Sequence, residues 1–233
     1  MRRLIYANAA AIDLSEHHGD PAVREANAEI ASLMTPLSKA WSTDVGFEMA
    51  SMGVQIHGGM GFIEETGAAQ HMRDARIAMI YEGTNGIQAI DLIGRKLGVR
   101  GGAAIGEYLD RIGATVQSMA AFDVLALSAA ALADALDAAR STTKWMLTTT
   151  DNDDRLAGAT PYLRIVALVT AADLMAQSAI ARLGANDTNS ADAQLQTTRF
   201  FCEQLLPAAG GLSASVMAGA SALRSGSQHL DVA

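Results

Sequence analysis

The sequence predicts an all-α protein built from two successive helical units. Half of its 233 residues are hydrophobic, only 5% are aromatic, and Ala and Leu recur throughout. Small and aliphatic side chains favour packed helices over a sheet built on Val, Ile and aromatic residues. No segment alternates apolar and polar residues as a half-buried strand requires. The glycine pair Gly101-Gly102 marks a boundary, so the expected domains are residues 1–100 and 101–233.

Start and stop signals divide the first region into helices. Asp20-Pro21 places an N-cap residue before a proline at the first helical position. Thr35-Pro36 repeats this signal, so we expect one helix to end near Met34 and another to begin at Pro36. Thr84 is the expected N-cap of the last helix of this region, and Gly98 ends it. The expected helices cover residues 2–14, 21–34, 36–55, a short segment from residue 66, and 84–97.

The second region is typical of an antiparallel bundle of helices. Thr160-Pro161 begins its central apolar helix, and Gly184 ends it. The acidic run at residues 151–154, Asp-Asn-Asp-Asp, predicts a polar loop. The expected helices cover residues 103–119, 122–148, 160–184, 192–206 and 212–223.

Charge and cysteine content exclude several classes of function. The formal net charge is −8 and no long basic run occurs, which argues against a nucleic-acid partner. The most apolar stretch, residues 162–185, carries Arg164, Asp173 and Arg182, so we expect no membrane span. The single cysteine, Cys202, fits a reducing compartment and reads as a small buried apolar residue. These features together predict a cytoplasmic protein.

The first motif that can carry chemistry is Gln55-Ile56-His57-Gly58-Gly59-Met60-Gly61, at a helix end. Consecutive glycines let a backbone approach a ligand closely and expose its amides to phosphate oxygens. No strand precedes the motif, so a Rossmann interpretation fails. The alternative interpretation is a plain glycine-rich helix stop.

The second motif is Tyr81-Glu82-Gly83-Thr84-Asn85-Gly86-Ile87-Gln88. A carboxylate on a loop among apolar neighbours is a candidate general base. Gly83 would let a substrate pass close to the backbone, and the polar residues after it start a helix, where a pyrophosphate binds readily. The alternative is that Glu82 is simply an acid stabilised by the dipole at a helix N-terminus.

In order and spacing, the two motifs together resemble the acyl-CoA dehydrogenase family. The resemblance covers about residues 1–98. Residues 103–233 resemble the additional C-terminal helical domain of a longer bacterial branch, so the implied fold is a C-terminal-type bundle of this family followed by a second antiparallel bundle. The matching segments are Pro36-Leu37-Ser38-Lys39-Ala40-Trp41, residues 54–62, Arg73-Asp74-Ala75-Arg76-Ile77 and residues 81–88.

The resemblance implies an activity and a set of site residues. Glu82 corresponds to the family's base, which removes the α-proton of an acyl-CoA, while FAD accepts hydride from the β-carbon and electron transfer flavoprotein reoxidises the flavin. The product is a trans-2-enoyl-CoA. Gly83 would contact substrate, no metal is implied, and the protein should be a homo-oligomer, a dimer or tetramer. The implied FAD contacts are Gln55, Ile56, His57, Gly58 and Gly59 toward a neighbouring subunit, and Thr84, Asn85 and Gly86 beside the base.

The resemblance also implies that parts of the complete enzyme lie outside these residues. A full member of this branch has an N-terminal helical domain, a middle β-domain and a further first helix of the C-terminal domain. We therefore expect residues 1–233 alone to be inactive. One alternative is a non-catalytic assembly module from a truncated paralogue. Another is an acyl-CoA oxidase, which uses the same base and differs in oxygen access.

Overall fold

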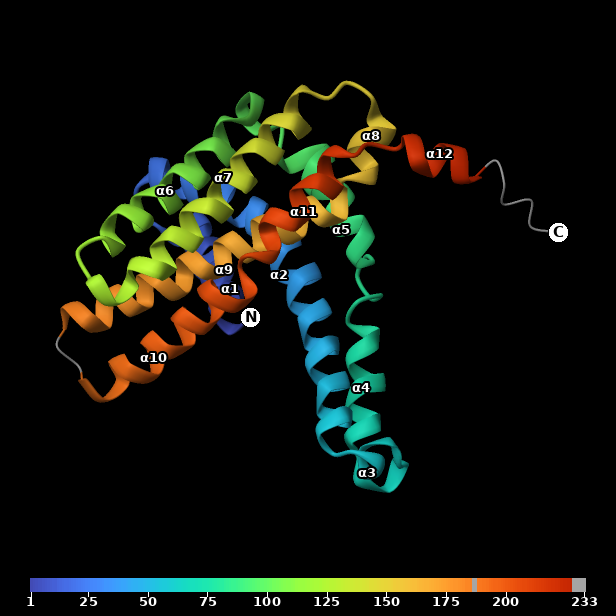
Figure 1. Cartoon of the computed structure of the whole chain (residues 1–233). Coiled ribbons are helices and arrows are strands. Elements are labelled where there is room, and N and C mark those ends of the chain that lie inside the picture. The colour runs from blue at the N-terminus through green and yellow to red at the C-terminus, as the bar shows by residue number, and fades with distance from the viewer. Residues whose placement is uncertain (186–187, 228–233) are drawn as a thin grey trace.

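The computed structural model describes residues 1–185 and 188–227, and all regular elements among them are helical, which confirms the predicted all-α class (Figure 1). The α-helices are α1 Arg2–His17, α2 Pro21–Ile56, α3 Gly59–Phe62, α4 Ala68–Ile77, α5 Asn85–Asp91, α6 Ala103–Met119, α7 Ala126–Thr148, α8 Asn152–Ala157, α9 Ala159–Gly184, α10 Thr188–Phe200, α11 Ala208–Met217 and α12 Ser221–Ser227. Short 3-10 turns lie at Glu64–Thr66, Val99–Gly102 and Asp123–Leu125, and π-helical turns at Leu92–Lys96 and Phe201–Leu205.

The molecule consists of a packed body and a projecting arm (Figure 1). In the body, α6, α7, α9, α10 and α11 lie side by side as the predicted antiparallel bundle, and α1 and the first half of α2 pack against it. The arm, residues 44–77, is the second half of α2 paired with α4, with α3 at its tip. The arm therefore carries the glycine motif away from the body.

The two regions that the sequence distinguishes share one apolar core. The ring of Trp41 in α2 meets Phe201 edge-on, with 6.4 Å between ring centroids. Arg155 of α8 donates a hydrogen bond to the carbonyl of Ile93 at 2.6 Å. These contacts fix the orientation of the first region on the second. At the boundary itself, Arg100 pairs with carboxylates on both sides, namely Glu29 and Glu107, each at 2.7 Å.

The predicted break between Met34 and Pro36 is wrong, because α2 continues through Pro36 as one helix. A proline inside a helix lacks a donor and costs about 3 kcal/mol. Here Pro36 is buried between the fully packed side chains of Leu33 and Leu37. Burying each such side chain contributes roughly 1.5–3 kcal/mol, so packing in the core outweighs the local signal.

Two further boundaries differ from expectation. The predicted polar loop at residues 151–154 is the start of α8, because the Asp151 carboxylate accepts hydrogen bonds from the backbone N–H groups of Asp153 and Asp154 and so caps the helix. The expected helix at residues 212–223 is two helices, α11 and α12, separated at Gly219, whose φ of 68° is left-handed. The expected N-caps Asp20 and Thr84 are confirmed.

Helix α9 runs through the centre of the bundle and is buried along most of its length. By length and composition alone it is also apolar enough to cross a membrane, and 67% of that apolar window is buried inside the fold. Cys202, in the π turn after α10, is fully buried as predicted, and burial raises the pKa of its thiol to about 12.

One acidic side chain, Asp173, lies in the buried part of α9 and is 6% exposed. Its Oδ2 accepts a hydrogen bond from Gln177 at 2.8 Å, whereas its Oδ1 has no partner among the described residues. Desolvation raises the pKa of Asp173, and the hydrogen bond from Gln177 opposes that rise only partly. The folded state thus favours the protonated form, and ionisation of Asp173 destabilises the fold as pH rises.

We predict that Asp173→Asn stabilises the protein at pH 7.5, because a neutral amide replaces a carboxylate whose ionised form is disfavoured by burial. A gain of about 1 kcal/mol would raise Tm by about 2–4 °C in a chain of this size. The measurement is thermal unfolding by circular dichroism at several pH values. The difference from wild type should shrink toward pH 4, where Asp173 itself becomes protonated. The control is Asp134→Asn, at an exposed position of α7. A difference that does not vary with pH would contradict this account.

Candidate functional site

The glycine motif lies at the tip of the arm, where α2 ends and the chain turns into α3. Gly58 has a φ of 62°, which favours glycine. A side chain at Gly61 would overlap the carbonyl oxygen of Val54 and come within 2.8 Å of the Cβ of His57, so this turn requires glycine. The side chain of His57 has a structural role here, because its Nδ1 lies 2.8 Å from the Gly53 carbonyl oxygen of the same helix.

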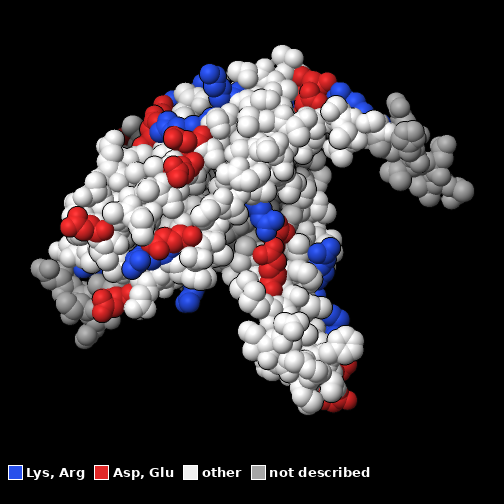
Figure 2. All heavy atoms as spheres, viewed as in Figure 1, with Lys and Arg blue, Asp and Glu red and all other residues white. Residues whose placement is uncertain are grey.

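The surface of this tip is open and apolar. Gln55, Ile56 and Gly59 are exposed, and added Cβ atoms at Gly58 or Gly59 would meet nothing within 4 Å. The tip carries few charged side chains on the face shown in Figure 2. Large apolar side chains are exposed around it, with Ile56 78% and Phe62 82% accessible. Exposed apolar side chains of this size are common where protein surfaces pack together.

The second motif forms a loop between α4 and α5. We define the base loop as residues 79–85; the N–H of Asn85 donates to the Met79 carbonyl at 3.1 Å and closes it. Glu82 has a φ of 54°, a left-handed conformation that costs a non-glycine residue roughly 1–2 kcal/mol. Gly83 follows with a φ of 88°. Glu82 is exposed, so the loop presents its carboxylate outward from the chain.

The base loop also presents unpaired backbone donors. In the described part of the chain, the N–H groups of Glu82, Gly83 and Thr84 make no hydrogen bond to another protein group. The Thr84 hydroxyl instead accepts from the N–H of Ile87 at 3.3 Å and caps α5. A carboxylate beside free N–H groups can accept a proton while those groups stabilise negative charge on a bound oxygen.

A network of side chains attaches this loop to α2. Lys39 Nζ donates to the Gly83 carbonyl at 2.5 Å and to Asn85 Oδ1 at 2.9 Å. Asn85 Nδ2 donates to Asp44 Oδ1 at 2.6 Å and to the Ala40 carbonyl at 3.1 Å. The role of Asn85 as a cofactor contact stays a prediction. Its side-chain amide is already hydrogen-bonded to groups of α2. Sequence reasoning gave Lys39 no role, because its partners lie 44 and 46 residues further along the chain.

The structure does not bring the two predicted motifs together. Lys39, beneath the base loop, and Gln55, in the glycine motif, lie on the same helix. The helical rise of about 1.5 Å per residue separates them by about 24 Å along its axis. Gly86, in the first turn of α5, stays with the base loop. The two clusters therefore cannot enclose one small ligand within a single chain.

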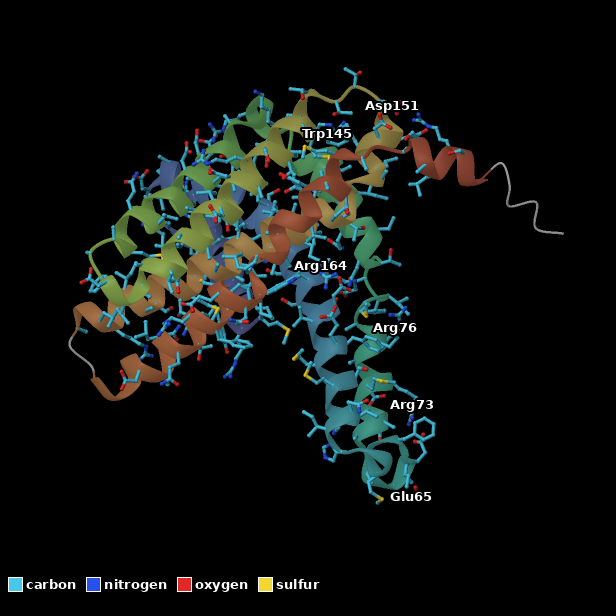
Figure 3. The ribbon with its side chains drawn as sticks, in the orientation of Figure 1. Glu65, Arg73, Arg76, Trp145, Asp151 and Arg164 are labelled. Carbon is cyan, nitrogen blue, oxygen red and sulfur yellow. The ribbon has the colours of Figure 1, made fainter. Side chains whose placement is uncertain are left out.

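The basic residues of α4 are held by partners within the arm (Figure 3). Arg73 forms two hydrogen bonds with the carboxylate of Glu64, at 2.6 and 2.5 Å. The guanidinium of Arg76 lies over the ring of Phe47, 5.3 Å from its centroid. At the root of the arm, Arg164 of α9 pairs with Glu48 of α2 at 2.9 Å and ties the arm to the body.

A cavity of about 690 Å³ lies beside this root, between the start of the chain, α2, α9 and α11. Its walls are largely apolar and include Trp41, Met175 and Phe201. None of the residues predicted from the two motifs lines it. It is thus separate from the base loop and from the glycine turn. In the described part of the chain, no cluster of His, Cys, Asp and Glu side chains suitable for a metal ion occurs.

Comparison with known families and proteins gives a consistent result. Residues 1–98 match the family described as Acyl-CoA dehydrogenase, C-terminal domain, and residues 108–225 match Acetyl-CoA dehydrogenase C-terminal like. The chain is 39% identical over 214 residues to 3-methylmercaptopropionyl-CoA dehydrogenase of Ruegeria pomeroyi, covering 88% of this chain and 36% of that protein. It is 30% identical over 220 residues to a butyryl-CoA dehydrogenase of Syntrophomonas wolfei, covering 88% of this chain and 35% of that protein.

A solved structure shares the fold. Caenorhabditis elegans ACDH-11, in complex with C11-CoA, superposes with a TM-score of 0.72 at 22% identity, covering 88% of this chain and 34% of that one. The chain thus spans about a third of the length of the relatives that it matches. On the family matches and the identity to the two dehydrogenases, this chain belongs to the acyl-CoA dehydrogenase family, and it corresponds to the C-terminal helical region of that family.

Proposed function

We propose that this chain is the C-terminal part of an FAD-dependent acyl-CoA dehydrogenase and that Glu82 is its general base. The observation that carries this proposal is the base loop, which presents a carboxylate next to the free N–H groups of Glu82 and Gly83. The two relatives at 39% and 30% identity, both named as acyl-CoA dehydrogenases, support the substrate class.

The chemistry requires the two groups that the loop supplies. The Glu82 carboxylate removes the α-proton of the acyl thioester, and the negative charge that develops on the thioester oxygen is stabilised by the N–H of Glu82. FAD, when bound, accepts hydride from the β-carbon, so that the product is a trans-2-enoyl-CoA. Gly83 has no side chain to obstruct the substrate.

The residues that would hold FAD fit a dinucleotide. At the arm tip, Gly58 and Gly59 have open space where a side chain would stand, so a phosphate can approach their backbone. Beside the base, the N–H of Thr84 has no partner among the described residues, and Gly86 is exposed. Because the two clusters lie far apart on one helix, the tip would serve the cofactor of a second subunit. Electron transfer flavoprotein is the proposed electron acceptor.

A second candidate function is a non-catalytic assembly module. It is favoured by the exposed apolar side chains of the arm, which can pack against another surface. An acyl-CoA oxidase shares the same base, and it is distinguished by direct reduction of oxygen to hydrogen peroxide. The three alternatives make different predictions for turnover, cofactor binding and electron acceptor.

We predict that Glu82→Gln in the full-length enzyme carrying this region abolishes dehydrogenation and leaves FAD bound. Glutamine cannot accept the α-proton, and loss of a positioned base costs about 10²- to 10⁴-fold in rate. The measurement is flavin bleaching on addition of an acyl-CoA, with the visible spectrum as the check on FAD. The matched control is Glu25→Gln, at an exposed position in the first half of α2, which should turn over normally. Near-normal turnover of Glu82→Gln would refute the assignment.

We predict that residues 1–233 alone do not hold FAD and do not oxidise acyl-CoA. Each polar contact at Gly58, Gly59 or Thr84 contributes only about 1 kcal/mol in competition with water. A few such contacts do not offset the entropy lost when a flexible dinucleotide is immobilised. The test is to add excess FAD, remove the free cofactor by gel filtration and record the visible spectrum. A stoichiometric flavin band that bleaches with an acyl-CoA would show that this fragment is complete in itself.

We predict that the full-length enzyme forms a dimer or tetramer through the arm. The tip exposes Ile56 and Phe62, and burial of such side chains between subunits is favourable. Light scattering gives the mass, and Phe62→Asp should weaken association because it places a charge in the contact. Leu127→Asp, on an exposed face of α7, is the control. A fully active monomer would contradict the prediction.

A further inference from the structure

We propose that Lys39 is a positioning residue that fixes the base loop on α2. The inference rests on the proposed function in one respect, since it takes Glu82 as the base. It assigns a role to a lysine that lies 44 residues before the loop carbonyl it binds.

The first step of the argument is the position of the two acceptors. Lys39 Nζ binds the carbonyl of Gly83 and Oδ1 of Asn85, which lie on either side of Thr84. The bound carbonyl belongs to the residue directly after Glu82. Because a peptide unit is planar, fixing this oxygen fixes the peptide that joins Gly83 to Thr84. The bond thus restrains the loop beside two residues in left-handed conformations, Glu82 and Gly83.

The second step is an anchor that carries no charge. Asn85 Nδ2 donates to Asp44 Oδ1 and to the Ala40 carbonyl, so Asn85 docks the same loop on the same turns of α2. Lys39 and Asn85 are also bonded to each other. Loss of either side chain should therefore loosen the loop.

The third step is the charge around Lys39. Its side chain is half-buried; burial lowers the pKa of Lys39, whereas the carboxylates of Asp44 and Glu82 raise it. Two charged side chains near the loop have other partners: Arg76 lies over the ring of Phe47, and Asp91 pairs with Arg95 and Lys96. In the described part of the chain, the hydrogen bonds to Gly83 and Asn85 are the polar contacts of the Lys39 ammonium group.

The first experiment measures the loop without any catalysis. In residues 1–233, amide hydrogen exchange is compared for wild type, Lys39→Met, Asn85→Ala and the control Lys144→Met, at an exposed position of α7. The reporter is the Asn85 N–H, which bonds to the Met79 carbonyl at 3.1 Å. We expect this amide to exchange about tenfold faster in Lys39→Met and in Asn85→Ala, because a hydrogen bond that holds the loop is lost. Lys144→Met should match wild type.

The second experiment measures the base in the full-length enzyme. Lys39→Met should lower kcat about 10- to 100-fold, because a misplaced base reacts slowly. The effect should fall on kcat more than on KM, since the base is displaced while the binding surface is retained. Asn85→Ala should lower kcat as well. Lys39→Arg, which can still donate hydrogen bonds to the same acceptors, should keep kcat near the wild-type value.

The outcomes separate this inference from the proposed function. Wild-type exchange at the Asn85 amide in Lys39→Met, or an unchanged kcat, overturns the role of Lys39. If Lys39→Met does not fold, Lys39→Gln carries the same two measurements. A Glu82→Gln enzyme that retains turnover would refute Glu82 as the base, and the exchange experiment would still decide whether Lys39 restrains the loop.

Discussion

The structure depends on the continuity of α2 through Pro36. This helix is the element shared by the body and the arm, and a break at the proline would let the two move independently. The missing donor at Pro36 costs about 3 kcal/mol, but the surrounding stretch buries Leu33, Leu37 and Trp41 in the core. Because the packed half of the helix is fixed, the direction of the exposed half is fixed as well. The ion pair between Arg164 and Glu48 restrains the arm where it leaves the body.

The base loop uses the same helix as its support. A glutamate in a left-handed conformation persists only where its surroundings hold it there. Here the loop is held by Lys39 of α2, which binds the Gly83 carbonyl, and by Asn85, which binds Asp44 of α2. A loop positioned by a rigid element combines exposure with precision, which reactive groups require. The free N–H groups of Glu82 and Gly83 follow from the same geometry, because the chain turns there without forming helix or strand.

The sequence predicted the parts of this arrangement that depend on near neighbours. The caps at Asp20 and Thr84 and the glycine turn at residues 58–61 were predictable because their partners lie within a few residues. The continuation of α2 through Pro36 was not, because it depends on packing in the core. The anchoring of the base loop by Lys39 was also missed, since it joins residues 44 positions apart. Local patterns identified the candidate residues, and long-range contacts determined how they are held.

On the proposed function, the same geometry explains why this region needs further protein around it. Hydrogen bonds from free N–H groups stabilise a developing charge most strongly where water is excluded, yet Glu82 is exposed in this chain. The tip of the arm meanwhile exposes large apolar side chains, including Ile56 and Phe62. A surface that packs on the arm tip would bury these side chains. On this proposal, the continuous α2 would hold the base loop at one active site and the glycine turn, about 24 Å away along its axis, at another.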